Sequence, residues 1–504
     1  MAKNTIPVDT HGISLILKYA IASRILVIAL IVLWRSLLSP YDTSASLNPS
    51  CLISDSDSNP NSQVLLPRLA SALEDSVVWD SVYFVRIAQC GYEYEQSYAF
   101  LPLLPICISF LSRTVFAPFV PFIGQRAVLA LSGYALNNIA FVFSALFFYR
   151  LSILILNNAE VALRASILFC FNPASIFYTS IYSESLHALL SVGGLYNFVH
   201  GANNAATLCF ALSGVARSNG VLNAGYIGFQ MLHRAYHAIV LKKRTYVGLQ
   251  VIVSGGLRCL FIFIPFLSFQ AYGYLNICST QPGDGMRPWC KARLPLLYSY
   301  IQSHYWGVGF LRYFQVKQLP NFLLATPILS LSVWSIIHYV KLWPEAFVYL
   351  GLGSSPANNE LTESVFCLGS DNKTMSAGIF ENETSSTLQD VRSTKLRKRS
   401  NREGNIATRQ SEDKHKPSSD SGCFPVVALP FTLHLGFMAA TAFLVMHVQV
   451  ATRFLSASPS LYWFASYIMA SNNAGKRWGY IIWTYCAAYI LLGSLLFSNF
   501  YPFT

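Results

Sequence analysis

Residues 79–91, Trp-Asp-Ser-Val-Tyr-Phe-Val-Arg-Ile-Ala-Gln-Cys-Gly, form a polar stretch between two apolar segments. A carboxylate held near a membrane surface, as we expect for Asp80, can act as a general base when its surroundings tune its pKa. A second interpretation is structural, because Asp80 could cap a short helix that Gly91 ends. The residues of this stretch leave both interpretations open.

Ionisable and polar side chains also interrupt the apolar regions further along the chain. Glu184 follows Tyr182-Ser183, and Arg217 and Asn219 stand together in Arg-Ser-Asn-Gly. Such groups cost free energy in lipid, so they are predicted to line a cavity that faces protein. A purely structural pairing of Glu184 with Arg217 is the alternative.

Residues 295–313 combine polar and aromatic side chains at helical spacing. Tyr298, Gln302 and Tyr305 are predicted to share one helix face, which could stack on a sugar ring and hydrogen-bond its hydroxyls. An interfacial helix with a belt of aromatic residues is the alternative interpretation.

The composition indicates the class of protein that must position these residues. The chain has 504 residues, of which 53% are hydrophobic and 12% charged, and its mean hydropathy is +0.42. These values predict an all-α polytopic membrane protein. The net charge of +12 resides largely in short loops between apolar segments, which argues against a nucleic-acid partner.

Windows of about 20 apolar residues predict membrane spans. Eleven are expected, near residues 13–38, 99–121, 127–149, 162–182, 184–202, 205–231, 248–272, 319–343, 424–449, 455–471 and 478–497. The stretch from 162 to 231 is the weakest, because Pro173, Arg217 and Asn219 interrupt it and some of its segments could be re-entrant.

The charges of the loops predict the orientation. The loop of residues 39–98 is acidic and the connection of residues 232–247 is basic, which places the first loop outside the cytosol or in a lumen. Counting spans then puts the loop of residues 273–318 in the lumen and residues 344–423 in the cytosol. The loop of residues 273–318 is basic, which by itself would favour the cytosol. Its charges could bind an anionic lipid or a lipid phosphate. Alternatively, a loop of this length translocates regardless of its charge.

Three domains are therefore expected: a catalytic membrane domain over residues 1–343, a polar insert over 344–423, and C-terminal transmembrane helices over 424–504. Within the insert, residues 354–422 are predicted to be disordered. Glycosylation sequons at Asn372 and Asn382 would require a lumen, but a run of basic residues favours the cytosol. The cysteines show no metal-binding spacing, although Cys278 with Cys290, and Cys51 with Cys90, could form disulfides in an oxidising lumen.

Several ordered motifs together resemble one known family, the second mannosyltransferase of GPI-anchor assembly. They are Trp79-Asp80, Phe171-Asn-Pro-Ala-Ser, Tyr182-Ser-Glu, Ala216-Arg-Ser-Asn-Gly, Pro288-Trp-Cys, Tyr300-Ile-Gln, Tyr305-Trp, Gly309-Phe-Leu-Arg-Tyr, Gln318-Leu-Pro-Asn-Phe, Ser456-Ala-Ser-Pro-Ser-Leu-Tyr-Trp-Phe and Ser498-Asn-Phe-Tyr-Pro-Phe-Thr. The resemblance covers nearly the whole chain; the Ser/Asn-rich part of the first loop and the insert fall outside it.

The resemblance implies a GT-C glycosyltransferase in the endoplasmic-reticulum membrane with its active site facing the lumen. Its donor would be dolichyl-phosphate-mannose and its acceptor a GPI-precursor glycolipid, which receives the second mannose in α-1,6 linkage. Membrane lipid and a small accessory membrane subunit are further expected partners.

The resemblance also implies roles for individual residues. Asp80 would be the base of an inverting single displacement, with Trp79 beside it, and the second luminal motif falls on Gln302, Tyr305 and Trp306. From their charge, and not from the resemblance, basic groups such as Arg86, Arg217 or Arg312 could stabilise the departing phosphate. Glu184 and Asn219 complete the predicted substrate-binding set. No DxD motif demands a metal, so no cofactor is predicted and the metal requirement stays open.

Two functions from other classes stay open on composition alone. A lipid transporter or scramblase could use the same intramembrane polar residues as a pathway, and a non-catalytic subunit of a glycolipid-assembly complex would have the same hydropathy. An acidic residue at position 80 is needed only by the enzyme.

Overall fold

The structure is a computed structural model that describes residues 9–41, 64–279, 287–352, 425–470 and 475–501. These residues form helices and connecting loops, with no strand among them, so the predicted all-α class is confirmed. Residues 353–423 of the predicted insert, which include both sequons, lie outside the described residues.

Six helical segments of the described chain are long and apolar enough to cross a membrane. They are α1 (Thr10–Leu37), α6 (Val120–Leu156, preceded by a short turn from Ala117), α12 (Thr245–Cys278), α14 (Leu319–Leu342, preceded by a turn from Val316), α17 (Leu429–Leu444, preceded by a turn from Val426) and α20 (Gly475–Ser498). The number of eleven spans is therefore not confirmed.

The other expected spans are shorter helices in the structure. They are α5 (Leu103–Arg113), α7 (Ala159–Cys170), α8 (Ser175–Thr179), α9 (Glu184–Val199), α10 (Asn203–Ala216), α11 (Ala224–Tyr236) and α19 (Pro459–Ala470). The short helix α18 (Ala451–Leu455) lies at the boundary between the expected spans at 424–449 and 455–471. The predicted break at Asn172-Pro173 is confirmed, because α7 ends just before it and Asn172 Oδ1 accepts a hydrogen bond from the Ala174 amide at 2.8 Å. Hydropathy windows join such helices because both sides of the break are apolar.

The main core lies where α6, α7, α8 and α19 pack together. Fully buried aromatic rings fill it, with Phe148 stacked on Phe169 at a centroid distance of 4.7 Å. The α1 residue Arg24 is also buried here, 3.8 Å above the ring of Phe141. Its guanidinium donates to the carbonyl oxygens of Cys170 and Ser175 at 3.2 and 3.1 Å, so it binds the C-terminal end of α7 and the start of α8.

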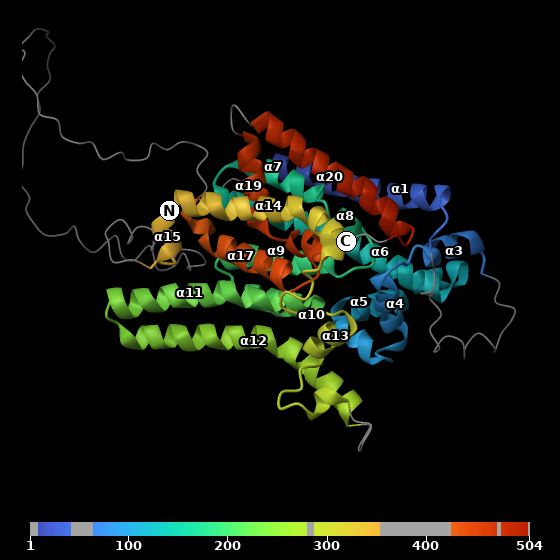
Figure 1. Cartoon of the computed structure of the whole chain (residues 1–504), viewed down its shortest axis with the longest axis horizontal. Helices are drawn as coiled ribbons and strands as arrows, with labels where there is room; N and C mark the ends of the chain where they lie inside the picture. Colours follow the sequence, from blue (N-terminus) through green and yellow to red (C-terminus); the bar gives the residue numbers. More distant parts are fainter. Residues whose placement is uncertain (1–8, 42–63, 280–286, 353–424, 471–474, 502–504) are drawn as a thin grey trace, which may run out of the picture. The chain divides into compact units, whose positions relative to one another are not determined.

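A second group of helices carries the polar loops. Figure 1 shows α11 and α12 side by side, and α12 leads into a segment with η5 (Pro288–Lys291) and α13 (Leu297–Tyr305). The predicted Cys278–Cys290 disulfide is confirmed and closes this segment. Cys51 lies outside the described residues, so its pairing with Cys90 stays a prediction.

Two short helices complete the polar region. These are α3 (Pro67–Asp75) and α4 (Asp80–Cys90), followed by η1 (Glu95–Ala99). The first residues of the predicted insert form α15 (Pro344–Val348), which follows α14.

Candidate active site

A cavity of about 400 Å³ opens among α4, α9, α13, α18 and α20 and brings together residues from distant parts of the sequence. Its lining includes six of the predicted site residues: Trp79, Asp80, Glu184, Arg217, Gln302 and Trp306. The volume lies within the usual range of small-ligand sites.

The backbone at Trp79 aims Asp80 into this cavity. Trp79 has φ 55° and ψ −133°, a conformation that L residues rarely adopt, and it immediately precedes α4. Its indole Nε1 donates to the Phe497 carbonyl oxygen at 3.2 Å, and its ring lies 5.8 Å from that of Phe500. The Asp80 amide donates to the Tyr182 hydroxyl at 3.1 Å. These contacts stabilise an otherwise unfavourable turn.

The helix-cap interpretation of Asp80 is wrong in one respect. Asp80 is the first residue of α4, Trp79 occupies the cap position, and no side chain caps the helix. The predicted end of the helix at Gly91 is confirmed, with a φ of 78° that suits glycine. The Asp80 carboxylate is thus not engaged in capping and lies in the cavity, with 38% of its side chain exposed.

Arg453 stands between the two carboxylates of the site. Its Nη1 lies 3.6 Å from Asp80 Oδ2, and its Nε lies 3.5 Å from Glu184 Oε1. Arg453 lies on the five-residue helix α18 and was not among the site residues predicted from the sequence. A signal was present, because Arg453 is a cation between the expected spans at 424–449 and 455–471.

Glu184 and Arg217 line the cavity, as predicted, and they also form the ion pair that was the alternative interpretation. Glu184 is 2% exposed at the start of α9, and Arg217 has extended backbone just after α10. The next turn packs tightly on α10, since a Cβ on Gly220 would collide with the Ser213 backbone. The pair therefore has a structural role and also contributes charge to the cavity.

The environment of Asp80 raises the pKa of its carboxyl. Burial raises the pKa of the Asp80 carboxyl above its ordinary value, the positive charge of Arg453 opposes this rise, and the negative charge of Glu184 adds to it. A carboxyl with a raised pKa accepts a proton more readily, which is the property a general base requires.

Helix α13 presents two polar side chains to the cavity. Tyr298 and Gln302, one turn apart, both line it, and the Tyr298 hydroxyl lies 2.8 Å from Ser218 Oγ. Tyr305, which was predicted to share their face, instead donates its hydroxyl to Glu95 at 2.7 Å. Trp306 lies just beyond the helix and lines the cavity.

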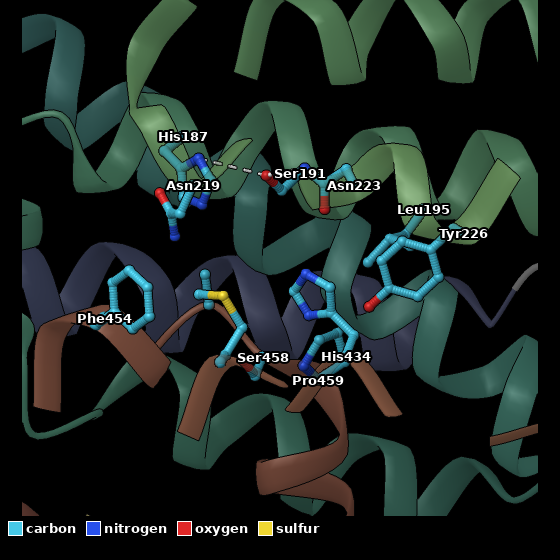
Figure 2. A pocket seen from close by; sticks show the side chains of 12 residues that line it. His187, Ser191, Leu195, Asn219, Asn223, Tyr226, His434, Phe454, Ser458 and Pro459 are labelled. Atoms are coloured by element: carbon cyan, nitrogen blue, oxygen red, sulfur yellow. Dashed lines mark hydrogen bonds between the residues drawn. The ribbon is translucent and has the colours of Figure 1, made fainter. Parts of the chain in front are cut away.

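The structure places three other predicted residues elsewhere. Arg86 pairs with Glu93 at 2.6 Å and donates to the Tyr94 hydroxyl, and Arg312 is exposed in a loop. Asn219 lines a separate cavity of about 20 Å³, seen in Figure 2 beside His187 and His434. None of the three is among the residues that line the larger cavity, and their substrate-binding roles stay predictions.

The described residues contain no cluster of three or more metal-ligating side chains. A membrane-spanning helical bundle that encloses two carboxylates, two guanidinium groups, polar side chains and aromatic rings defines a polytopic membrane protein with an internal polar site. Such a site can bind a polar, phosphorylated head group while the surrounding helices contact lipid.

Comparisons with known proteins identify the family. The family described as Mannosyltransferase (PIG-V) matches residues 13–504, so the chain belongs to this family and is a glycosyltransferase. Similar proteins include GPI alpha-1,6-mannosyltransferase 2 of Rattus norvegicus, 29% identical, and of Homo sapiens, 28% identical, each covering 91% of this chain and 84% of the relative. GPI mannosyltransferase 2 of Drosophila melanogaster is 29% identical over 84% of this chain and 86% of the relative. No solved structure matches.

Proposed function

We propose that this enzyme transfers the second mannose, in α-1,6 linkage, from dolichyl-phosphate-mannose to a GPI precursor in the endoplasmic-reticulum membrane. Membership of the mannosyltransferase family and the similarity to GPI alpha-1,6-mannosyltransferase 2 support the reaction. The disulfide in the segment that carries α13 supports a site that faces an oxidising lumen. A small accessory membrane subunit remains a further prediction.

One observation carries the catalytic proposal: Asp80 lies in the cavity, 3.6 Å from Arg453, without a capping role. In the proposed step, the acceptor 6-hydroxyl oxygen attacks the anomeric carbon of the donor while Asp80 takes its proton. The bond between that carbon and the phosphate oxygen breaks, and its electron pair leaves with dolichyl phosphate. Attack from the face opposite the phosphate inverts the anomeric carbon, so the enzyme forms no covalent intermediate.

The charges of the site support the proposed step. Two carboxylates balance two guanidinium groups before the step, because Asp80 and Glu184 face Arg453 and Arg217. Once Asp80 has taken the acceptor proton, only Glu184 opposes the two arginines. The site therefore gains affinity for an anion when the phosphate departs, and stabilisation of charge that develops in the transition state accelerates a reaction.

The aromatic and polar lining supports sugar binding. Trp79, Phe100 and Trp306 present apolar rings to the cavity, while Gln302 and Ser218 supply hydrogen-bonding groups. Such a mixture fits a hexose, which has apolar faces and polar edges.

The test is complementation of cells that are stalled after the first GPI mannose. Wild type, Asp80→Asn and the control Asp75→Asn are expressed at equal levels, and the lipid-linked intermediates are measured. Asp75 is exposed on α3 and hydrogen-bonds only to Ser71 among the described contacts, so its amide should rescue. We expect Asp80→Asn to lose at least about 100-fold in rate, as is typical for removal of a general base.

Rescue by Asp80→Asn at the wild-type level would refute the base assignment. Failure of wild type to rescue would refute the proposed step in GPI assembly. The donor is tested separately, by supplying the purified enzyme with dolichyl-phosphate-mannose or with a soluble nucleotide-linked mannose. Transfer from the nucleotide sugar alone would contradict the proposed donor.

A further inference from the structure

We propose that Glu95 is a positioning residue, which fixes α13 and thereby holds Gln302 and Trp306 in the substrate cavity. This inference rests on the proposed function of that cavity. Nothing in the sequence singled out Glu95, which is one of several acidic residues in the loop of residues 39–98.

Glu95 is a buried carboxylate that three donors approach. Its Oε1 accepts from the Trp289 indole at 2.7 Å, and its Oε2 accepts from the Tyr305 hydroxyl at 2.7 Å. Arg287 Nη2 lies 3.5 Å from Oε2. Only 6% of the Glu95 side chain is exposed, so these partners replace the water that an ionised carboxylate would otherwise bind. Glu95 thus joins η1 to both η5 and the end of α13.

A disulfide and an apolar cluster hold the segments around Glu95. The disulfide ties Cys290, the neighbour of Trp289, to Cys278 at the end of α12. Leu297 and Ile301 of α13 are fully buried in a cluster that also contains Tyr98 and Phe269. The apolar cluster holds one side of α13, and the Tyr305–Glu95 hydrogen bond fixes its last turn.

The same region forms one side of the substrate cavity. Gln302 and Trp306, on either side of Tyr305, line the cavity, and so do Phe100 and Leu101, which directly follow η1. Glu95 is therefore linked to both parts of the cavity wall. Phe100 and Leu101 follow it closely in the chain, and the Tyr305 hydrogen bond links it to the segment that carries Gln302 and Trp306. A shift of α13 would move Gln302 and Trp306 without touching Asp80.

The hydrogen bond from Tyr305 to Glu95 does not depend on pH in the physiological range. Burial, together with the neighbouring Glu95 carboxylate, raises the pKa of Tyr305 to about 12. The phenol therefore keeps its proton, and remains a donor to Glu95, at any physiological pH.

The test is steady-state kinetics on purified Glu95→Gln, with rates expressed per mole of folded enzyme. The amide keeps the shape but loses the charge and one acceptor oxygen. We expect the KM for the acceptor or donor to rise about fivefold or more, while the pH profile of kcat stays that of wild type, because loss of uniform binding changes KM and leaves kcat largely unchanged. The control is Asp75→Asn, which neutralises an exposed carboxylate on α3 that accepts from Ser71 and does not line the cavity, so its KM should be that of wild type.

Tyr305→Phe supplies a second variant that removes only one donor. Its KM should rise less than that of Glu95→Gln, and the double variant should show less than the product of the two effects, since both substitutions break one shared hydrogen bond. Wild-type KM values in both single variants would overturn the proposal, as would a loss confined to the yield of folded enzyme.

The two proposals fail in distinguishable ways. If Asp80→Asn is fully active, the base assignment fails, but the KM of Glu95→Gln still reports on the cavity wall. If Glu95→Gln has a normal KM while Asp80→Asn is inactive, only the positioning role is refuted.

Discussion

Replacement of Arg453 by glutamine should reduce the activity and move its pH dependence. The positive charge of Arg453 lowers the pKa of Asp80 against the opposing effect of burial, so its removal raises that pKa further. The base is active only when it is ionised. The acidic limb of kcat/KM should therefore move to higher pH in Arg453→Gln.

The size of the effect follows from the distance. Two unit charges 3.6 Å apart, as in the Arg453–Asp80 pair, interact by about 1 kcal/mol in water and about 5 kcal/mol at an effective dielectric constant of about 20. Because 38% of the Asp80 side chain is exposed, the interaction is screened towards the lower value, about 1–2 kcal/mol. This corresponds to a loss of about 5-fold to 30-fold in kcat/KM at a fixed pH below the new pKa. Loss of a contact between Arg453 and the donor phosphate would lower kcat/KM further.

The assay is kcat/KM for mannose transfer over a range of pH, with wild type and Arg164→Gln for comparison. Arg164 pairs with Glu160 on the outside of α7 and should show the wild-type profile. The reasoning is refuted if Arg453→Gln retains the wild-type acidic limb or moves it to lower pH. The raised pKa of Asp80 also affects stability. Because the folded state holds the Asp80 proton to higher pH than the unfolded state, the free energy of unfolding falls as pH rises from the ordinary pKa to the raised one.

Two further predictions concern residues that hold the site in place. Trp79→Phe keeps a ring beside Phe500 but loses the bond to the Phe497 carbonyl; kcat should fall by about 5-fold, the equivalent of about 1 kcal/mol. Trp34→Phe, which loses a bond to Ser494 on the same helix α20, is the control, and an equal loss there would contradict a role specific to Trp79. Arg24→Met leaves the carbonyl oxygens of Cys170 and Ser175 without their donor and should lower the unfolding free energy in detergent by about 1–3 kcal/mol. The control is Lys18→Met at an exposed position of the same helix. An unchanged unfolding free energy of Arg24→Met would contradict the role of Arg24 in binding α7 and α8.

The charged and polar residues that break apolar segments could be recognised in the sequence. Glu184, Arg217 and Asp80 stand out because ionisable groups are rare beside membrane spans, and the structure brings all three to one cavity. The disulfide between Cys278 and Cys290 was predictable because both cysteines share one polar loop.

Hydropathy alone does not decide the number of spans, because it does not tell what covers an apolar helix. Helices that are apolar all round can be buried in protein as well as in lipid. Phe177 and Tyr178 of α8, and most of α19, are buried against other helices. In the sequence they cannot be distinguished from lipid-facing spans.

The class, the all-helical fold and several residues of the site could be predicted from the sequence, because composition and local spacing are properties of the linear chain. Which residues meet depends on the tertiary structure. Arg453 reaches Asp80, Tyr305 points to Glu95, and Arg86 pairs with Glu93 outside the cavity. Side-chain direction depends on how each helix is rotated against its neighbours, and packing between segments distant in the sequence sets that rotation.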